Sequence, residues 1–512
     1  MKTYSKLLCT LLALLTLFTF SSCDASNKAD EGNGPLQDVE DGIYPSFGIA
    51  PDKEEAENAG SDVSQDFAEN PFVATAENNV STFSADVDTA SYAYFRKLVN
   101  LDYSLSALKG QASSFRAEEF INYFDYDVSA PAENELFGTQ VNIIDCPWNA
   151  GSVLMRLTLQ AETAVEAVGN NLVFLIDVSG SMNSPHKLDL LKTSFTYLID
   201  NLRPQDTVSI VTYSGRETVA LDGCSGQDGE RILNVIRSLT ANGSTNGEAG
   251  LSKAYDIAEK HFIEGGNNRI IMASDGDLNV GISSEEELKR FIEQKRDAGI
   301  YLSVLGFGTG NYRDAKMETL ADNGNGVYYY IDGESEAEKV FGTDILGTLY
   351  TVAQDVKLQI TFDTQYVAAY RLIGYENRVL NKEDFEDDTK DAGDVGAGHQ
   401  VTVCYELTLA EGARNADAPW MKLDVRYKNP GETVSNLNEY EIGKSALTDT
   451  PNEDMKFLSC VLRTVMVLHS SRYLNETTLT DVLGDLRALD LSAYPDRMEF
   501  RSLIEKLVQD QV

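Results

Sequence analysis

Histidine is scarce in this chain, and its scarcity narrows the chemistry that the protein could perform. Among 512 residues there are four histidines, His186, His261, His399 and His469, and none stands in a zinc-binding or catalytic-triad motif. His186 follows Ser181 by five residues, but the sequence supplies no positioned general base beside them. We therefore expect that the protein is not an enzyme, with metal-assisted hydrolysis as the alternative because a bound metal ion can activate water.

Basic residues are also few. The chain has 42 Lys and Arg against 81 Asp and Glu, which gives a formal net charge of −39. Such a surplus of acids would repel nucleic-acid phosphates, so we expect no nucleic-acid partner. The charge agrees with a cation-binding protein outside the cytoplasm, although an acidic surface also serves solubility alone.

Long apolar runs are missing as well. The longest, Leu7–Phe20, has about fourteen residues, which is too short to span a bilayer, and it follows a lysine-bearing N-terminus as in an export signal. The run ends in Phe20-Ser21-Ser22-Cys23, which resembles a bacterial lipobox except that phenylalanine replaces the usual leucine. The resemblance implies a lipoprotein signal peptide at residues 1–22 and lipid modification of Cys23. A secreted protein with an unrelated cysteine is the alternative.

The segment after Cys23 predicts a spacer. Residues 24–80 contain fourteen acids and two lysines, with little periodic apolar pattern, so we expect residues 23–80 to be an acidic, disordered linker. Several acyl chains on one cysteine anchor a protein stably without spanning the membrane. We therefore expect a protein of the bacterial cell envelope, lipid-anchored to a membrane, with the outer membrane favoured over the inner.

Four further cysteines follow in the exported part of the chain. In such a protein four cysteines allow three disulfide pairings, and the sequence cannot choose among them. Buried free thiols are an equal alternative, because one of the four alternates within a strand pattern and another lies in an apolar helical run. The four are Cys146, Cys224, Cys404 and Cys460.

One short run carries most of the functional information. The apolar residues Val173–Ile176 are followed by Asp177, Ser179 and Ser181, a pattern typical of a buried parallel strand that ends in a polar turn. Open α/β sheets bind ligands at the carboxyl ends of their strands. Aspartate and serine oxygens are hard donors that suit Mg²⁺ better than zinc or copper.

Two more elements complete the pattern. A Gly-rich turn that contains Thr245 opens a helical pattern, and a second apolar strand ends at Asp275. Together these residues resemble the metal-ion-dependent adhesion site of the von Willebrand factor type A (vWA) family, whose D-x-S-x-S signature begins here at Asp177. The resemblance implies a site for Mg²⁺, with Mn²⁺ or Ca²⁺ as substitutes, and a partner protein that offers an Asp or Glu to the ion. The implied metal ligands are Asp177, Ser179, Ser181, Thr245 and Asp275.

Strands and helices alternate through residues 166–350, which predicts an α/β domain with a doubly wound, mostly parallel, Rossmann-like sheet. The flanking residues 81–165 and 351–512 show alternating strand patterns, and the second region closes with three helical patterns. These flanks resemble companion regions of exported bacterial vWA proteins. We expect their strands to form one β-sandwich-like region into which the α/β domain is inserted.

Asp86 and Asp88 are a second candidate pair. They could be metal ligands, but a helical pattern follows them, so the simpler interpretation is that Asp88 or Thr89 caps that helix. For the whole chain we expect a lipid-anchored, Mg²⁺-dependent binding protein that captures a partner's carboxylate. An assembly factor that works beside an ATPase is the non-adhesive alternative.

Overall fold

The computed structural model describes residues 68–133, 135–163, 169–244, 247–276, 285–308 and 314–509. The predicted signal peptide, Cys23, most of the predicted linker and Thr245 lie outside these residues. All the described residues belong to one compact unit, Lys53–Val512. Within the described ranges, no helix is both long and apolar enough to cross a bilayer.

The central domain contains one six-stranded sheet in the order β10-β9-β8-β5-β6-β7. Its middle strand, β5, pairs in parallel with both neighbours, and only β7 at the edge runs antiparallel. The sequence did not indicate β7, because only two of its nine side chains are buried and an Asp-Gly pair interrupts it. The strands are β5 (Asn170–Asp177), β6 (Thr207–Tyr213), β7 (Glu217–Ser225), β8 (Asn267–Ser274), β9 (Ile300–Phe307) and β10 (Tyr328–Ile331).

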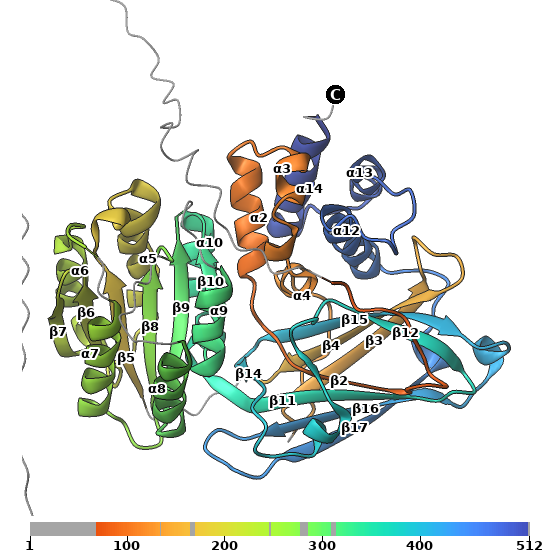
Figure 1. The fold of residues 1–512 in the computed structure, drawn as a ribbon, viewed down its shortest axis with the longest axis horizontal. Helices are drawn as coiled ribbons and strands as arrows, with labels where there is room; N and C mark the ends of the chain where they lie inside the picture. Colours follow the sequence, from red (N-terminus) through yellow and green to blue (C-terminus); the bar gives the residue numbers. More distant parts are fainter. Residues whose placement is uncertain are drawn as a thin grey trace, which may run out of the picture. The chain divides into compact units, whose positions relative to one another are not determined.

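Helices cover both faces of this sheet, as Figure 1 shows in green and yellow. Alternate residues of β5 belong to two hydrophobic cores. Phe174 lies in the core that contains residues of α5 and α6, and Val173 lies in the core that contains residues of α7, α8 and α9. This two-sided burial explains the continuous apolar run in the sequence and confirms the predicted doubly wound α/β class. The helices are α5 (Leu190–Ile199), α6 (Gly229–Ser238), α7 (Gly247–Lys260), α8 (Glu285–Asp297), α9 (Asp314–Asn323), α10 (Glu334–Glu338) and α11 (Ile345–Leu349).

The flanking strands form two sheets, in the orders β1-β12-β15-β4-β3 and β13-β2-β11-β16-β17, with β14 added beside β11. Each sheet combines strands from before and after the central domain: β4 pairs with β15, and β2 with β11. The predicted insertion of the α/β domain into one sandwich is therefore confirmed. The strands are β1 (Val73–Ala74), β2 (Val80–Ser84), β3 (Phe137–Asp145), β4 (Val153–Ala161), β11 (Thr351–Phe362), β12 (Val367–Ile373), β13 (Val379–Leu380), β14 (Gly393–Gly396), β15 (Gln400–Leu409), β16 (Pro419–Lys428) and β17 (Asn436–Gly443).

Aromatic side chains fill the space between the two sheets. Phe362 of β11 stacks on Tyr370 of β12 with ring centroids 4.4 Å apart, and Phe83 of β2 lies 6.3 Å from Tyr405 of β15. The prediction that residues 23–80 form a disordered linker is wrong at its C-terminal end, because β1 pairs with β12 and β2 starts at Val80. Their short apolar pattern was masked in the sequence by the acidic stretch that precedes it.

The remaining helices pack together beside the sheet that contains β4 and β15 (Figure 1). Four aromatic rings pack against one another between these helices: Tyr92 of α2, Phe124 just after α4, Phe457 of α12 and Phe500 of α14. The ring centroids of Phe124 and Phe457 lie 4.9 Å apart. The predicted C-terminal helices are confirmed. These helices are α2 (Ala90–Asn100), α3 (Leu105–Lys109), α4 (Ala117–Asn122), α12 (Glu453–Leu468), α13 (Leu479–Arg487) and α14 (Pro495–Gln509).

The four described cysteines are buried and free. Burial raises the pKa of the Cys460 thiol to about 11, so that thiol stays protonated at neutral pH. Of the two alternatives that the sequence left open, buried thiols hold for Cys146, Cys224, Cys404 and Cys460.

Candidate metal centre

The first loop of the candidate site begins where β5 ends. The Oδ1 atom of Asp177 accepts a hydrogen bond of 2.8 Å from the backbone N–H of Ser179, which fixes the carboxylate against the loop. The hydroxyls of Ser179 and Ser181 lie 2.9 Å apart. Asp177 and Ser179 are buried, whereas Ser181 is exposed, so the oxygens run from the interior to the surface.

The neighbouring loops close on this one through their backbones. The N–H of Gly180 donates to the carbonyl of Gly243 at 3.0 Å, and the N–H of Asn242 donates to the carbonyl of Val178 at 2.8 Å. Gly243 has a φ of +82°, a conformation that glycine adopts without strain. These bonds place the chain that leads to Thr245 beside the Asp177 loop, although Thr245 itself lies outside the described residues.

The second carboxylate comes from the adjacent strand. β5 and β8 pair in parallel with Ile176 opposite Ala273, so Asp177 and Asp275 both follow at the same edge of the sheet. Asp275 is buried and receives the ammonium of Lys187 on its Oδ2 atom at 3.0 Å. The sequence analysis did not single out Lys187, because the two residues are 88 positions apart.

The environment of Asp177 works against a negative charge. Burial raises the pKa of Asp177 to about 6, and the charge of Asp275 adds to the rise, although the hydrogen bonds from Ser179 oppose it. Tyr213 of β6 is buried near Asp177. Burial is the main cause of the raised pKa of the Tyr213 phenol, and the charge of Asp177 adds to the rise. The Oδ2 atom of Asp177 is buried and makes no hydrogen bond within the described residues.

These features fit a divalent cation. A buried carboxylate oxygen that lacks a hydrogen-bond partner costs free energy unless a cation approaches it. Two carboxylates and two hydroxyls suit a hard ion such as Mg²⁺, and no described group of three His, Cys, Asp or Glu offers a softer alternative. The structure thus brings together Asp177, Ser179, Ser181 and Asp275 of the predicted ligand set.

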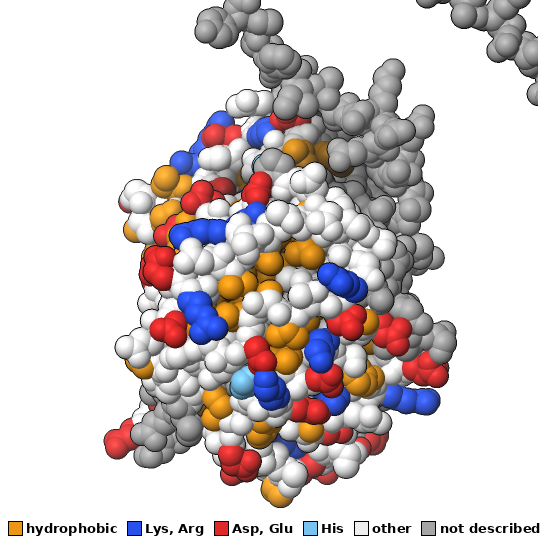
Figure 2. Space-filling model, turned by 90° about the vertical axis from the view of Figure 1, so that its left-hand side faces the viewer, with side chains coloured by type: hydrophobic (Ala, Val, Ile, Leu, Met, Phe, Trp, Pro, Cys, Tyr) orange, Lys and Arg blue, Asp and Glu red, His pale blue; other side chains and the backbone are white. Residues whose placement is uncertain are grey.

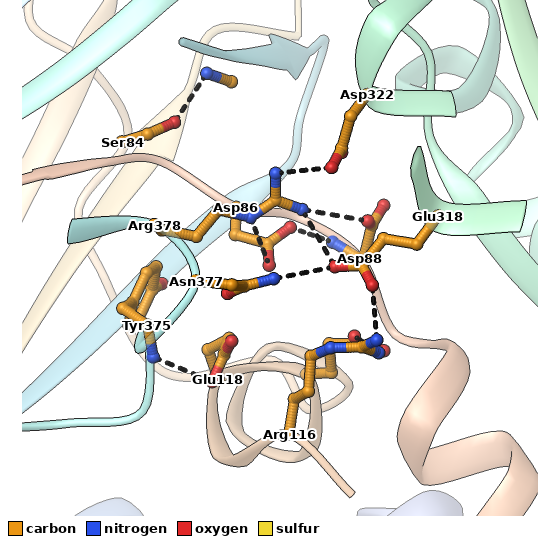
Figure 3. A network of polar contacts seen from close by, with 12 residues as sticks. Ser84, Asp86, Asp88, Arg116, Glu118, Glu318, Asp322, Tyr375, Asn377 and Arg378 are labelled. Atoms are coloured by element: carbon orange, nitrogen blue, oxygen red, sulfur yellow. Dashed lines mark hydrogen bonds and ion pairs between the residues drawn. The ribbon is translucent and has the colours of Figure 1, made fainter. Parts of the chain in front are cut away.

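The second candidate pair has a different fate, shown in Figure 3. Thr89 stands at the N-cap position of α2, as predicted, but its side chain makes no capping hydrogen bond. Asp88 instead accepts a 2.9 Å hydrogen bond from the backbone N–H of Tyr328, and the guanidinium of Arg378 lies 3.4 Å from Asp86 and 3.5 Å from Asp88. Arg378, which is distant in the sequence, pairs with both carboxylates. The sequence around Asp86 and Asp88 could not indicate this pairing.

The surface of the central domain mixes its charges. Figure 2 shows one face of it with lysines and arginines interspersed among aspartates and glutamates. Within the central domain, Asp222 pairs with Lys260 at 2.5 Å and with His261 at 2.7 Å.

Three family models match this chain. The one described as "von Willebrand factor type A domain" covers residues 171–343, and the one described as "Uncharacterized protein YfbK, C-terminal" covers residues 347–510. A third, described as "von Willebrand factor", covers residues 58–156. Domains of the type A family often carry a metal ion and indicate protein–protein interaction or adhesion.

Similar proteins extend the match over most of the chain. "Uncharacterized protein YfbK" of Escherichia coli (strain K12) is 39% identical over 478 residues, which cover 88% of this chain and 81% of that protein. "Inter-alpha-trypsin inhibitor heavy chain H3" of Mesocricetus auratus is 29% identical over 186 residues, 35% of this chain and 21% of that protein, so the chain spans only about a fifth of its length. The solved structure "von Willebrand factor type A from Catenulispora acidiphila" is 17% identical with a TM-score of 0.41, covering 76% of this chain and 89% of its own. The chain therefore belongs to the bacterial family of vWA-domain proteins that includes YfbK.

Proposed function

We propose that the protein is a lipid-anchored binding protein of the bacterial cell envelope that holds a Mg²⁺ ion and captures a carboxylate of a partner protein. The convergence of oxygen ligands from two strand ends carries this proposal. Within the described residues, the buried Oδ2 atom of Asp177 accepts no hydrogen bond, and the hydroxyls of Ser179 and Ser181 lie 2.9 Å apart on the loop that follows β5. This arrangement supports cation binding better than it supports a structural turn.

The chemistry of the ligands supports recognition rather than turnover. When bound, Mg²⁺ would supply an electrophilic position that an Asp or Glu of the partner can occupy. Ser179, Ser181 and Thr245 would contribute neutral hydroxyls, so the two aspartates alone would offset the charge of the ion. Because Ser181 is exposed, its oxygen lies where a partner can approach.

The first test measures the ion and then the partner. Isothermal titration of the soluble protein with Mg²⁺ should show uptake that Asp177→Ala and Thr245→Ala abolish. The matched control is Asp189→Ala, since Asp189 lies on the same loop-to-helix segment with its side chain 70% exposed. Affinity capture from envelope extract should then recover a partner in Mg²⁺ but not in EDTA or with Asp177→Ala. Mg²⁺ uptake by Asp177→Ala equal to that of the control would reject the proposal.

The anchor is tested separately. The lipobox-like run before Cys23 supports lipid modification of that cysteine. Cys23→Ser should move the protein from the membrane fraction to the soluble fraction of the envelope, and metabolic labelling with palmitate should disappear. A protein that stays membrane-bound after this change would require another anchor.

The non-adhesive alternative is an assembly factor for a cytoplasmic ATPase. The signal-like N-terminus opposes it, because ATP is absent outside the cytoplasm. Recovery of the unprocessed chain from the cytoplasm would favour that alternative.

A further inference from the structure

The side chain of Lys187 reaches into the candidate metal centre from the segment that joins the Asp177 loop to α5. Its ammonium lies 3.0 Å from Asp275 Oδ2 and donates to the carbonyl of Ser181 at 3.1 Å. It therefore bridges the loops that follow β5 and β8. At 17% exposure, the side chain is far less solvated than a typical surface lysine.

Packing against a third loop holds the stem of Lys187 in place. Gly308, which follows β9, has a φ of +86°, and a Cβ atom at that position would lie 2.3 Å from Cε of Lys187. The hydroxyl of Tyr330 donates to the carbonyl of Gly308 and fixes that stretch of backbone. The lysine stem thus lies in a groove that only glycine leaves open, and its position is set by the fold.

The charge of Lys187 opposes that of an incoming ion. The two aspartates and one ammonium give the centre a net charge of minus one, whereas the aspartates alone would give minus two. A fixed cation and a divalent ion a few ångströms apart in a partly buried site repel each other by a free energy worth at least a tenfold change in affinity. The same ammonium ties the loops together when no ion is bound.

We infer that Lys187 is a tethered counter-cation, which pins the loops of the metal centre in the absence of Mg²⁺ and weakens the binding of Mg²⁺. The inference rests on the proposed function, because it concerns the same site. It assigns to Lys187 a positioning role: its ammonium holds Asp275 and repels the ion, and the residue is not itself a ligand.

The test compares four proteins by titration calorimetry with Mg²⁺ alone. Lys187→Met keeps the stem that packs over Gly308 and removes the charge, so it should bind Mg²⁺ about tenfold more tightly than the unmodified protein. Lys187→Arg, which keeps the charge, should stay within about threefold. Lys192→Met is the matched control, because Lys192 lies five residues further on, pairs only locally with Asp189, and should leave the affinity unchanged.

Thermal unfolding supplies a second readout. In EDTA, Lys187→Met should unfold at a lower temperature than Lys192→Met, because the bridge between the loops is gone. In saturating Mg²⁺ the difference should shrink, so the rise in unfolding temperature on adding Mg²⁺ should be larger in Lys187→Met. An affinity of Lys187→Met equal to or weaker than that of Lys192→Met would overturn the inference. If the unmodified protein and every variant fail to bind Mg²⁺, the proposed function itself fails.

Discussion

Two groups of carboxylates in this molecule begin from similar sequence and reach opposite states. Asp177 follows an apolar strand in the central domain, and Asp86 follows β2 in the sandwich. Around Asp86 one arginine, Arg378, whose side chain is 12% exposed, pairs with four carboxylates, those of Asp86, Asp88, Glu318 and Asp322, at 2.9 to 3.5 Å. In the metal centre, the described ion pair of Lys187 is with Asp275.

The difference shows what makes a cluster of acids a site. Where an arginine already supplies the positive charge, the acids form a structural junction, here between α9 of the central domain and the sandwich (Figure 3). Where one buried oxygen accepts no hydrogen bond from the part of the chain that the structure describes, the acids are suited to an ion from solution. The local sequence of the two aspartates is similar; the distant cation distinguishes them.

The largest expected effect comes from removing the cation of the junction. Arg378→Met would leave buried carboxylates without a countercharge, and breaking a buried ion pair on one side costs about 3–5 kcal/mol. Urea unfolding should therefore show a large loss of stability, with Mg²⁺ binding retained in the protein that stays folded.

An exposed arginine provides the control for that change. Arg414 pairs with Asp145, and both side chains are largely exposed, so Arg414→Met should cost less than about 1 kcal/mol. Equal losses for the two variants would mean that the junction around Arg378 contributes no more than a surface pair. The contrast between the two clusters would then disappear.

A smaller effect should come from the ion itself. At a hundredfold excess over its dissociation constant, Mg²⁺ should stabilise the folded protein by about 2.7 kcal/mol. Asp177→Asn should lose this stabilisation, whereas Asp88→Asn, the matched change in the other cluster, should keep it. Without Mg²⁺, Asp177→Asn should be as stable as the unmodified protein or more stable, because it removes a buried charge. Chemical unfolding with and without Mg²⁺ measures the stability of each variant. Loss of the Mg²⁺ stabilisation in Asp88→Asn would mean that the ion binds at the cluster around Arg378 and not at Asp177.

Much of the fold could be predicted because its signals are local. The apolar run of β5 and the alternation of strands and helices follow from burial on two faces of a parallel sheet. Thr478 caps the N-terminus of α13 in a capping box with Asp481, three residues further along the chain. The short strand β1 was missed because only its pairing with the distant β12 makes it a strand. The edge strand β7 was missed because it pairs with one neighbour, β6, and buries only two of its nine side chains.

The site divides in the same way. Asp177, Ser179 and Ser181 are close in sequence and could be found as one motif, and Asp275 could be found as the end of a second strand. Lys187 could not, since its partner is 88 residues away. Arg371 is a second case: its guanidinium pairs with Glu406 at 3.1 Å, and Glu406 also accepts a hydrogen bond from Trp148. Such long-range contacts leave no local signal in the sequence.

The smallest effect concerns a carboxyl that has neither an arginine nor a metal site. Glu118, at the margin of the junction in Figure 3, accepts a 2.9 Å hydrogen bond from the N–H of Tyr375 and is fully buried. Burial raises its pKa to about 8, and the charge of Glu376 adds to the rise.

Because the folded state holds this proton more tightly than the unfolded chain does, stability should fall as pH rises from about 4.5, the ordinary pKa of a glutamate, to about 8. Glu118→Gln keeps the carbonyl acceptor and removes the titration, so the stability difference between this variant and the unmodified protein should grow in favour of the variant by about 1–2 kcal/mol from pH 6 to pH 8. Urea unfolding of both proteins at pH 6 and pH 8 measures this stability difference. A difference that does not change between the two pH values would contradict the raised pKa of Glu118.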